Sequence, residues 1–470
     1  MNHTRLLVTV AAGSAAVLAN FYSEPTKGND FRPVFADCAS PYEKTPSKNA
    51  SRKLELAKEK ARDALLKIKC EVGAPGVVIG VSVDGKVVWK EGIGLANVET
   101  RTLCHEETVM RIASISKSMT MAMVAKLWQD GKLDIDKPVQ EYVPSFPKKS
   151  FNGEKVDITT RMILSHIGGI RHYVKKGEQS ENELSEPESK KEKSTREKEV
   201  YNKERFESVE KALKLFDGDE LLSKPGTEYL YTTHGWTLVS AVVEGASKEE
   251  FTKHAKKFFS QLGLHKTRLD EPEPIIYNRA NYYLTKKNGR LANVPYSDNS
   301  YKWAGGGFVS TVGDLLKFGN AMLYSYQWQP SMTETSATDQ KISVPGLPPG
   351  FLNPETVREM WTVVPVTKQK NKSQRYRENG YGLGWQVVPF VAEYGTTGGG
   401  DVQPFSAFHT GAAVGASSVL LIKPVDRDIK DCSRSTPPRG ICVAILMNMQ
   451  NVGLAGVADD IARIIEEHYL

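Results

Sequence analysis

One short stretch holds most of the information in this sequence: Arg111-Ile-Ala-Ser114-Ile-Ser-Lys117. The residues that follow are apolar at close to helical spacing, include no proline and end before Gly131, which predicts a helix that begins at the serine. Residues three apart share one helix face, so the amine of Lys117 can reach the Ser114 hydroxyl. The positive end of the helix dipole also favours an alkoxide there. These features make Ser114 the candidate nucleophile, with its backbone N–H as an oxyanion donor.

The same S-x-x-K pattern occurs twice more, at Ser145 with Lys148 and at Ser208 with Lys211. Neither of these serines opens an apolar helix, so context ranks Ser114 first. A second interpretation of Ser114 stays open at this point: an ordinary N-cap serine followed by a solvent-facing lysine.

A second group of polar residues follows a Pro-Gly turn, in the stretch Lys224-Pro-Gly-Thr-Glu-Tyr-Leu-Tyr231-Thr-Thr233. Tyr231 comes just before the helical run 238–243, where a phenol can project into a cleft. If a neighbouring ammonium lowers the pKa of Tyr231, its phenolate can act as a general base. The alternative interpretation is an aromatic side chain that only anchors packing.

The third group is Phe408-His409-Thr410-Gly411-Ala412, on a predicted strand that continues to Ile422. The backbone of such a strand can lie beside an extended substrate. Gly411 permits close approach, and the N–H of Ala412 can supply a second oxyanion donor. A glycine that marks a β-bulge is the alternative.

In this order, the three groups resemble the motifs of the serine β-lactamase and penicillin-binding superfamily, in its class C and D-aminopeptidase branch. Three further segments are similar to motifs of that branch: 164–173, 304–315 and 381–385. The resemblance covers about residues 55–470. It implies an α/β (α+β) fold of the β-lactamase and penicillin-binding transpeptidase type, in which an antiparallel sheet is flanked by helices and joined to an all-helical region.

The resemblance also implies roles for individual residues. Ser114 would be the acylated nucleophile, Lys117 its proton relay, and Tyr231 the base and leaving-group acid, while the backbone N–H groups of Ser114 and Ala412 form the oxyanion hole. Substrate binding would fall to residues of the two later motifs: Thr233, His409, Thr410 and Gly411.

Two positions depart from the branch. Thr233 stands where an asparagine would hold a substrate carbonyl, and His409 stands where a lysine would offer a fixed positive charge to a β-lactam carboxylate. A histidine near pH 7 is mostly neutral. Efficient β-lactam turnover is therefore not expected, and a peptide, amide or ester substrate fits better. The classes that we carry forward are a serine hydrolase of peptidase type, an esterase, and a mainly structural protein with weak or no hydrolase activity.

The rest of the chain predicts one domain after a targeting region. Residues 1–50 read as a targeting segment or anchor and a linker, and residues 51–470 as the hydrolase domain. Within the domain, 174–207 is a charged insertion that we expect to be mobile, and 329–349 is a surface loop. Regular elements are expected in several stretches: a helix from Ser51, a hairpin over 77–89, strands over 382–388, 407–422 and 441–447, and a helix over 455–468.

The N-terminus has the composition of a sorting signal. Arg5 precedes an uncharged apolar run from Leu6 to Phe21, which is short for a membrane span, and no acidic residue precedes Glu24. These residues leave secretion and mitochondrial import both open. The resemblance is greatest to the mitochondrial β-lactamase-like proteins of animals. It thus implies the intermembrane space, association with the inner membrane through this segment, assembly into homo-oligomers or filaments, and a role in mitochondrial lipid metabolism.

Composition narrows the partners and cofactors. The 62 basic and 56 acidic residues leave a net charge of only +6, so no nucleic-acid partner is expected. The nine histidines form no H-x-H-x-D or H-E-x-x-H pattern, so neither a metal nor another cofactor is expected. Of the five cysteines, only Cys432 and Cys442 are close enough in sequence for a local disulfide. Scattered buried thiols are the alternative.

Overall fold

The computed structural model describes part of the chain in detail: residues 48–173, 199–328, 351–370, 376, 378–392, 402–425 and 438–469. The predicted targeting segment, the loop 329–349 and most of the insertion 174–207 lie outside these residues. The chain divides into two units, Met1–Asn49 and Ala50–Leu470, and the description below concerns the second.

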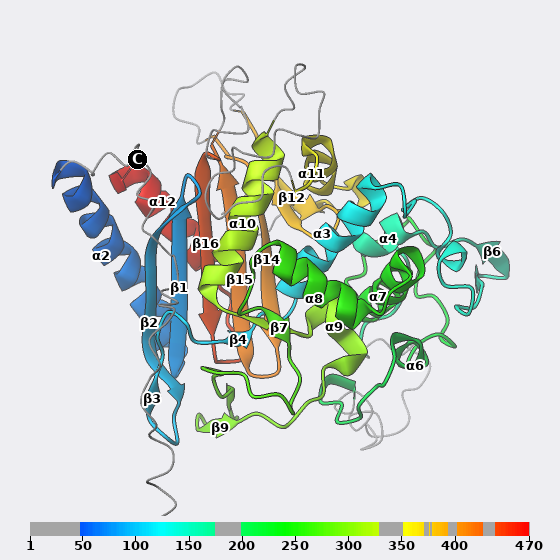
Figure 1. Cartoon of the computed structure of the whole chain (residues 1–470), viewed down its shortest axis with the longest axis horizontal. Helices are drawn as coiled ribbons and strands as arrows, with labels where there is room; N and C mark the ends of the chain where they lie inside the picture. Colours follow the sequence, from blue (N-terminus) through cyan, green and yellow to red (C-terminus); the bar gives the residue numbers. More distant parts are fainter. Residues whose placement is uncertain are drawn as a thin grey trace, which may run out of the picture. The chain divides into compact units, whose positions relative to one another are not determined.

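A large antiparallel sheet forms the centre of this unit (Figure 1). Within the described residues it has nine strands in the order β11-β12-β13-β14-β15-β16-β1-β2-β3. The strands are β1 (Gly76–Val83), β2 (Lys86–Asn97), β3 (Thr102–Leu103), β11 (Gln369–Lys370), β12 (Glu378–Tyr381), β13 (Gln386–Val388), β14 (Ser406–Ala413), β15 (Ala416–Pro424) and β16 (Gly440–Met447). Because β16 pairs directly with β1, the sheet is built from both ends of the domain, as the sequence predicts.

Helices cover both faces of the sheet, and most of them come from the middle of the chain. They are α2 (Lys48–Glu71), α3 (Ile115–Gln129), α4 (Thr160–Leu164), α6 (Val209–Leu213), α7 (His234–Ser247), α8 (Phe251–Gln261), α9 (Trp303–Gly306), α10 (Val312–Gln327), α11 (Pro354–Met360) and α12 (Ala455–Tyr469). Short strands β4 (Met110–Arg111), β7 (Arg268–Leu269) and β10 (Phe308–Ser310) form a separate small sheet. Small hairpins are made by β5 (Lys149–Phe151) with β6 (Glu154–Val156) and by β8 (Tyr283–Thr285) with β9 (Leu291–Asn293). No helix of the described residues is both long enough and apolar enough to cross a bilayer.

The alternation of side chains along β1 divides the core into two layers. Ile79 is fully buried in an apolar cluster with Leu65 of α2 and Ile461 of α12. Val78 points the other way, into the larger cluster that holds Leu316 of α10. The helices α2 and α12 therefore lie on one face of the sheet, and α10 lies on the opposite face with the helical region (Figure 1).

The predicted hairpin is confirmed, and two predicted strands are corrected. Asp84 and Gly85 have φ angles of 50° and 76°, as a type I′ turn requires. The stretch 407–422 is not one strand, because Gly415 takes a φ of 77° and turns β14 back into β15. The stretch 382–388 is also interrupted, since Gly384, with a φ of 71°, separates β12 from β13.

The suggested disulfide is not formed. Cys442 is a free and fully buried thiol in β16, while Cys432 lies outside the described residues. The Cys442 side chain packs against α10, where a Cβ on Gly319 would lie 3.3 Å from its sulfur. Cys70 and Cys104 are also free. The alternative of scattered buried thiols therefore holds for Cys104 and Cys442 but not for Cys70, which is exposed.

The two-layer core gives a stability prediction. We expect Ile79→Ala to lower the free energy of unfolding by about 2–5 kcal/mol, because it opens a cavity under α2 and α12. The control is Val87→Ala on β2, whose side chain is 48% exposed, and its effect should stay within about 0.5 kcal/mol. Urea denaturation measures both variants. Equal losses would contradict the placement of Ile79 in the core.

Candidate active site

Ser114 occupies the N-cap position of α3, but its side chain does not cap the helix. Its φ of −68° is helical, and its hydroxyl accepts no bond from the first turn. The preceding residue, Ala113, has a φ of 49°, in the left-handed region that non-glycine residues rarely adopt. This backbone turns the chain into the helix and leaves the Ser114 hydroxyl available to other side chains. The N-cap interpretation of Ser114 is therefore wrong.

Lys117 is fully buried beside this hydroxyl, which also excludes the solvent-facing interpretation. Its Nζ lies 3.1 Å from Ser114 Oγ and donates a hydrogen bond to the Gly305 carbonyl oxygen at 2.6 Å. Burial holds the pKa of Lys117 well below its ordinary value, and the positive charge of Lys302 lowers it further. A neutral amine with one N–H committed to Gly305 keeps a lone pair that can accept the serine proton.

Tyr231 completes the group on the other side of the serine. Lys117 Nζ lies 4.9 Å from the centre of its ring. Burial raises the pKa of Tyr231 above the usual value, although a hydrogen bond with Ser114 opposes this shift. The expected phenolate is therefore not favoured, because no ammonium lowers this pKa enough to offset desolvation. Tyr231 keeps its proton and can act as a donor.

His166 holds the Tyr231 ring in place and has no exposed surface of its own. The two rings lie 4.1 Å apart, and His166 Nδ1 accepts a hydrogen bond from the Thr232 N–H at 3.0 Å. Burial lowers the pKa of His166 well below its ordinary value. This histidine therefore has a structural role and orients the phenol.

The strand β14 approaches the serine closely because of Gly411. A Cβ on Gly411 would lie 2.4 Å from the Ile112 carbonyl oxygen and 3.0 Å from Ala113 Cβ. The Ser418 hydroxyl on the neighbouring strand donates to the same Ile112 oxygen at 2.8 Å. Gly411 thus serves this packing and is buried, whereas Thr410 and Ala412 on either side of it line the pocket.

His409 cannot replace the charge of a lysine. Its Nδ1 lies 2.7 Å from the Thr410 carbonyl oxygen and its Nε2 lies 2.8 Å from the Tyr381 hydroxyl. Because a carbonyl only accepts, Nδ1 carries the proton and Nε2 accepts from Tyr381. Burial lowers the pKa of His409 to about 3, so the ring is neutral near pH 7.

Thr233 lies at the N-terminus of α7 and lines the same pocket as His409. Its backbone N–H donates to His172 Nδ1 at 3.1 Å, and its hydroxyl is hydrogen-bonded to Tyr173. Thr233, His172 and Tyr173 all line the same pocket. Of the residues proposed from the sequence, those that line this pocket are Ser114, Tyr231, Thr233, His409, Thr410 and Ala412. Lys117 does not line the pocket but contacts Ser114 from within the core, and Gly411 does not line it either.

The two other S-x-x-K sequences have ordinary structural roles. Ser208 is an N-cap, because its Oγ accepts the backbone N–H of Lys211 at 3.2 Å. The Lys211 side chain is 63% exposed and pairs with Glu207. Ser145 and Lys148 are both exposed. Neither pair has the burial or the polar partners of Ser114 and Lys117.

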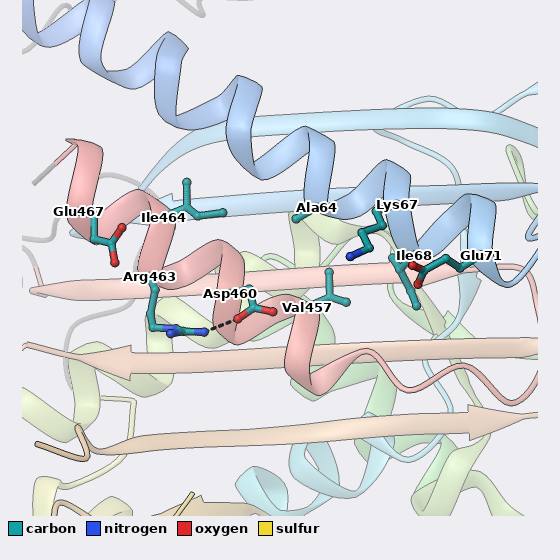
Figure 2. A pocket seen from close by; sticks show the side chains of 9 residues that line it. All are labelled: Ala64, Lys67, Ile68, Glu71, Val457, Asp460, Arg463, Ile464 and Glu467. Atoms are coloured by element: carbon teal, nitrogen blue, oxygen red, sulfur yellow. Dashed lines mark hydrogen bonds and ion pairs between the residues drawn. The ribbon is translucent and has the colours of Figure 1, made fainter. Parts of the chain in front are cut away.

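Two cavities show that the candidate active site is identified by the chemistry of its lining residues and not by the cavity volume. The cavity at Ser114 has a volume of about 350 Å³. A larger groove of about 490 Å³ lies between α2 and α12 (Figure 2), where the Arg463 and Asp460 side chains pair with each other. The described residues that line this groove are aliphatic or charged and include no serine, cysteine, histidine or tyrosine. Elsewhere in the described ranges, no three His, Cys, Asp or Glu side chains gather as a metal site.

Comparisons with known proteins agree with this geometry. The Beta-lactamase family model matches residues 57–466. The chain is 47% identical over 466 residues to the mouse protein called serine beta-lactamase-like protein LACTB, mitochondrial. The aligned region covers 89% of this chain and 82% of the mouse protein. The human protein of the same name is 47% identical over 461 residues, covering 89% of this chain and 81% of that protein.

Solved structures share the fold at low sequence identity. A penicillin-binding protein homologue from Pyrococcus abyssi is 21% identical with a TM-score of 0.62, covering 87% of this chain and 77% of that chain. A class C beta-lactamase is 16% identical with a TM-score of 0.58, covering 88% of this chain and 96% of that chain. The expected β-lactamase fold is thereby confirmed, and the chain belongs to the Beta-lactamase family, within the penicillin-binding superfamily of serine hydrolases.

Proposed function

We propose that this protein is a serine hydrolase of peptidase or amidase type that works through an acyl-enzyme on Ser114. The observation that carries the proposal is the buried Lys117 amine, 3.1 Å from the Ser114 hydroxyl and beside the Tyr231 ring. An amine and a phenol that both lie next to a serine hydroxyl are the groups that acyl transfer needs.

In the proposed acylation step, Ser114 Oγ attacks the substrate carbonyl carbon and its proton passes to Lys117 Nζ. The oxygen of the tetrahedral intermediate is held by the backbone N–H groups of Ser114 and Ala412. When the carbon–nitrogen or carbon–oxygen bond breaks, Tyr231 gives its proton to the leaving group, and Lys117 returns a proton to Tyr231. Lys117 is thus the base, and Tyr231 is the acid that its raised pKa favours.

Deacylation runs through the same groups. A water molecule attacks the ester carbonyl, its proton is taken up through Tyr231 and Lys117, and the Ser114 oxygen leaves and is reprotonated. The product acid and the free hydroxyl then restore the starting state, so that no cofactor is needed.

The neutral His409 supports a substrate other than a β-lactam. Both of its ring nitrogens are occupied, by Tyr381 and by the Thr410 carbonyl, so it offers no charge to a carboxylate on that wall. We therefore propose a peptide, amide or ester substrate bound along β14 beside Thr410 and opposite Thr233. An esterase is the close alternative, because the same proton transfers serve an ester.

The similarity to the mitochondrial LACTB proteins supports a mitochondrial location. We propose the intermembrane space, with inner-membrane association through the N-terminal segment, a role in lipid metabolism and assembly into homo-oligomers or filaments. Secretion is the alternative location, and a scaffold with weak hydrolase activity is the alternative function. Tagged protein with and without residues 1–21 tests the location, and sedimentation of the folded chain tests assembly.

Covalent labelling tests whether Ser114 is the nucleophile. We expect a fluorophosphonate probe to label the folded protein and Ser114→Ala to abolish that labelling, because the covalent bond forms at this oxygen. Ser208→Ala is the matched control, since Ser208 lies in the same S-x-x-K pattern but only caps α6. Intact mass spectrometry measures the adduct. If folded wild-type protein is not labelled, the scaffold alternative is favoured.

Two substrates with different leaving groups distinguish the base, Lys117, from the acid, Tyr231. Lys117→Met should slow hydrolysis of both an amide and an activated p-nitrophenyl ester by roughly 10²–10⁴-fold. Tyr231→Phe should slow amide hydrolysis by a similar factor but affect the ester much less, because p-nitrophenolate leaves without a proton. Tyr229→Phe is the control, because it removes a neighbouring phenol that is partly buried. If Tyr231→Phe slowed both substrates equally, Tyr231 would be the base and our assignment would be wrong.

A further inference from the structure

A second buried lysine faces the Ser114 pocket. Lys302 ends the short helix η2 (Ser300–Lys302) directly before α9, is only 7% exposed and lines the same cavity as Ser114 and Tyr231. Among the described residues, its ammonium has no hydrogen bond and no ion pair. Its nearest contacts are aromatic, with Nζ 5.0 Å from the centre of the Tyr301 ring and 6.0 Å from that of Tyr173.

The charges around Lys302 do not neutralise it locally. The buried carboxylate of Asp270 is bound by Arg111 Nε at 2.7 Å and by Asn299 Nδ2 at 2.7 Å, and Asp298 accepts the Ser300 N–H at 2.8 Å. Burial and the charge of Arg111 lower the pKa of Lys302 to about 7, while Asp270 and Asp298 oppose that shift. Below about pH 7, Lys302 is thus a desolvated cation at the wall of the pocket.

The other ionisable groups that face Lys117 carry no positive charge near neutral pH. His409 on β14 and His166 after α4 are held neutral by burial. Tyr231, before α7, is an uncharged phenol. Among these neighbours, Lys302 is the one whose positive charge lowers the pKa of Lys117.

We propose that Lys302 is a positioning residue for acylation: its unpaired ammonium, held at the pocket wall, acts together with burial to keep Lys117 in the neutral amine form that takes the Ser114 proton. The inference rests on the proposed function of Ser114 and Lys117. It assigns to Lys302 the positive charge that His409 does not supply. Lys302 lies directly before α9, whereas His409 lies on β14.

The test is the pH dependence of Ser114 labelling by a fluorophosphonate, measured between pH 4.5 and 9 on the full chain. Labelling should fall at acid pH as Lys117 takes up a proton. In Lys302→Met the repulsion is lost and the pKa of Lys117 rises. The acid limb, which is the part of the pH profile where labelling falls, should therefore move up by about one pH unit. At a pH on this limb, the labelling rate should then be roughly tenfold lower than in the wild type. The plateau at high pH should keep the wild-type rate.

Two controls make the result specific. Lys302→Arg retains the charge and should keep the wild-type limb, even if Lys302→Met folds poorly. Lys126→Met removes a lysine of α3 that is 41% exposed and pairs with Asp130, and it should leave the limb unchanged. Circular dichroism and the thermal midpoint report folding of each variant.

Three outcomes would overturn the inference: the same limb in Lys302→Met and wild type, an equal displacement in Lys302→Arg and Lys302→Met, or a loss confined to the plateau. A change only in the concentration dependence of labelling would assign Lys302 to ligand binding instead and would also overturn it. Absence of Ser114 labelling in the wild type would refute the proposed function itself, so the two failures are distinguishable.

Discussion

The Lys117 amine is completely buried between the Gly305 carbonyl oxygen at 2.6 Å and Ser114 Oγ at 3.1 Å, and the rest of the site depends on this arrangement. Transfer of an ammonium out of water is costly, so burial favours the neutral amine. Three elements maintain the burial. Helix α3 carries the lysine, α9 provides the carbonyl, and β14 reaches the loop before Ser114 because Gly411 lacks a side chain.

Around this amine the two described walls of the pocket differ in charge. The wall at β14 is neutral, because His409 is locked between Thr410 and Tyr381. The wall at α9 carries Lys302, without a counter-ion among the described residues. The positive charge at the pocket therefore comes from Lys302 and not from the β14 position at which the motif predicts a lysine.

Local features could be predicted from sequence, and long-range ones could not. The contact of Lys117 with Ser114 follows from helical spacing, and the β1–β2 hairpin follows from the turn chemistry of Asp84 and Gly85. The strand 407–422 was wrongly predicted as continuous, because the apolar pattern runs through the turn at Gly415. The proton-donor state of Tyr231 and the neutral state of His409 depend on tertiary burial. Gly305 and Lys302 lie in or next to a recognisable motif, but nothing in their spacing reveals which side chain they face.

The protonation state of Lys117 is the central physical claim, and it can be measured directly. The protein would be labelled with ¹³C at lysine Cε, the Lys117 resonance would be assigned by its absence in Lys117→Arg, and its chemical shift would be followed with pH. We expect this resonance to titrate well below the ordinary lysine pKa of 10.5, so that Lys117 is an amine at neutral pH. A resonance that titrates with the exposed lysines would contradict it.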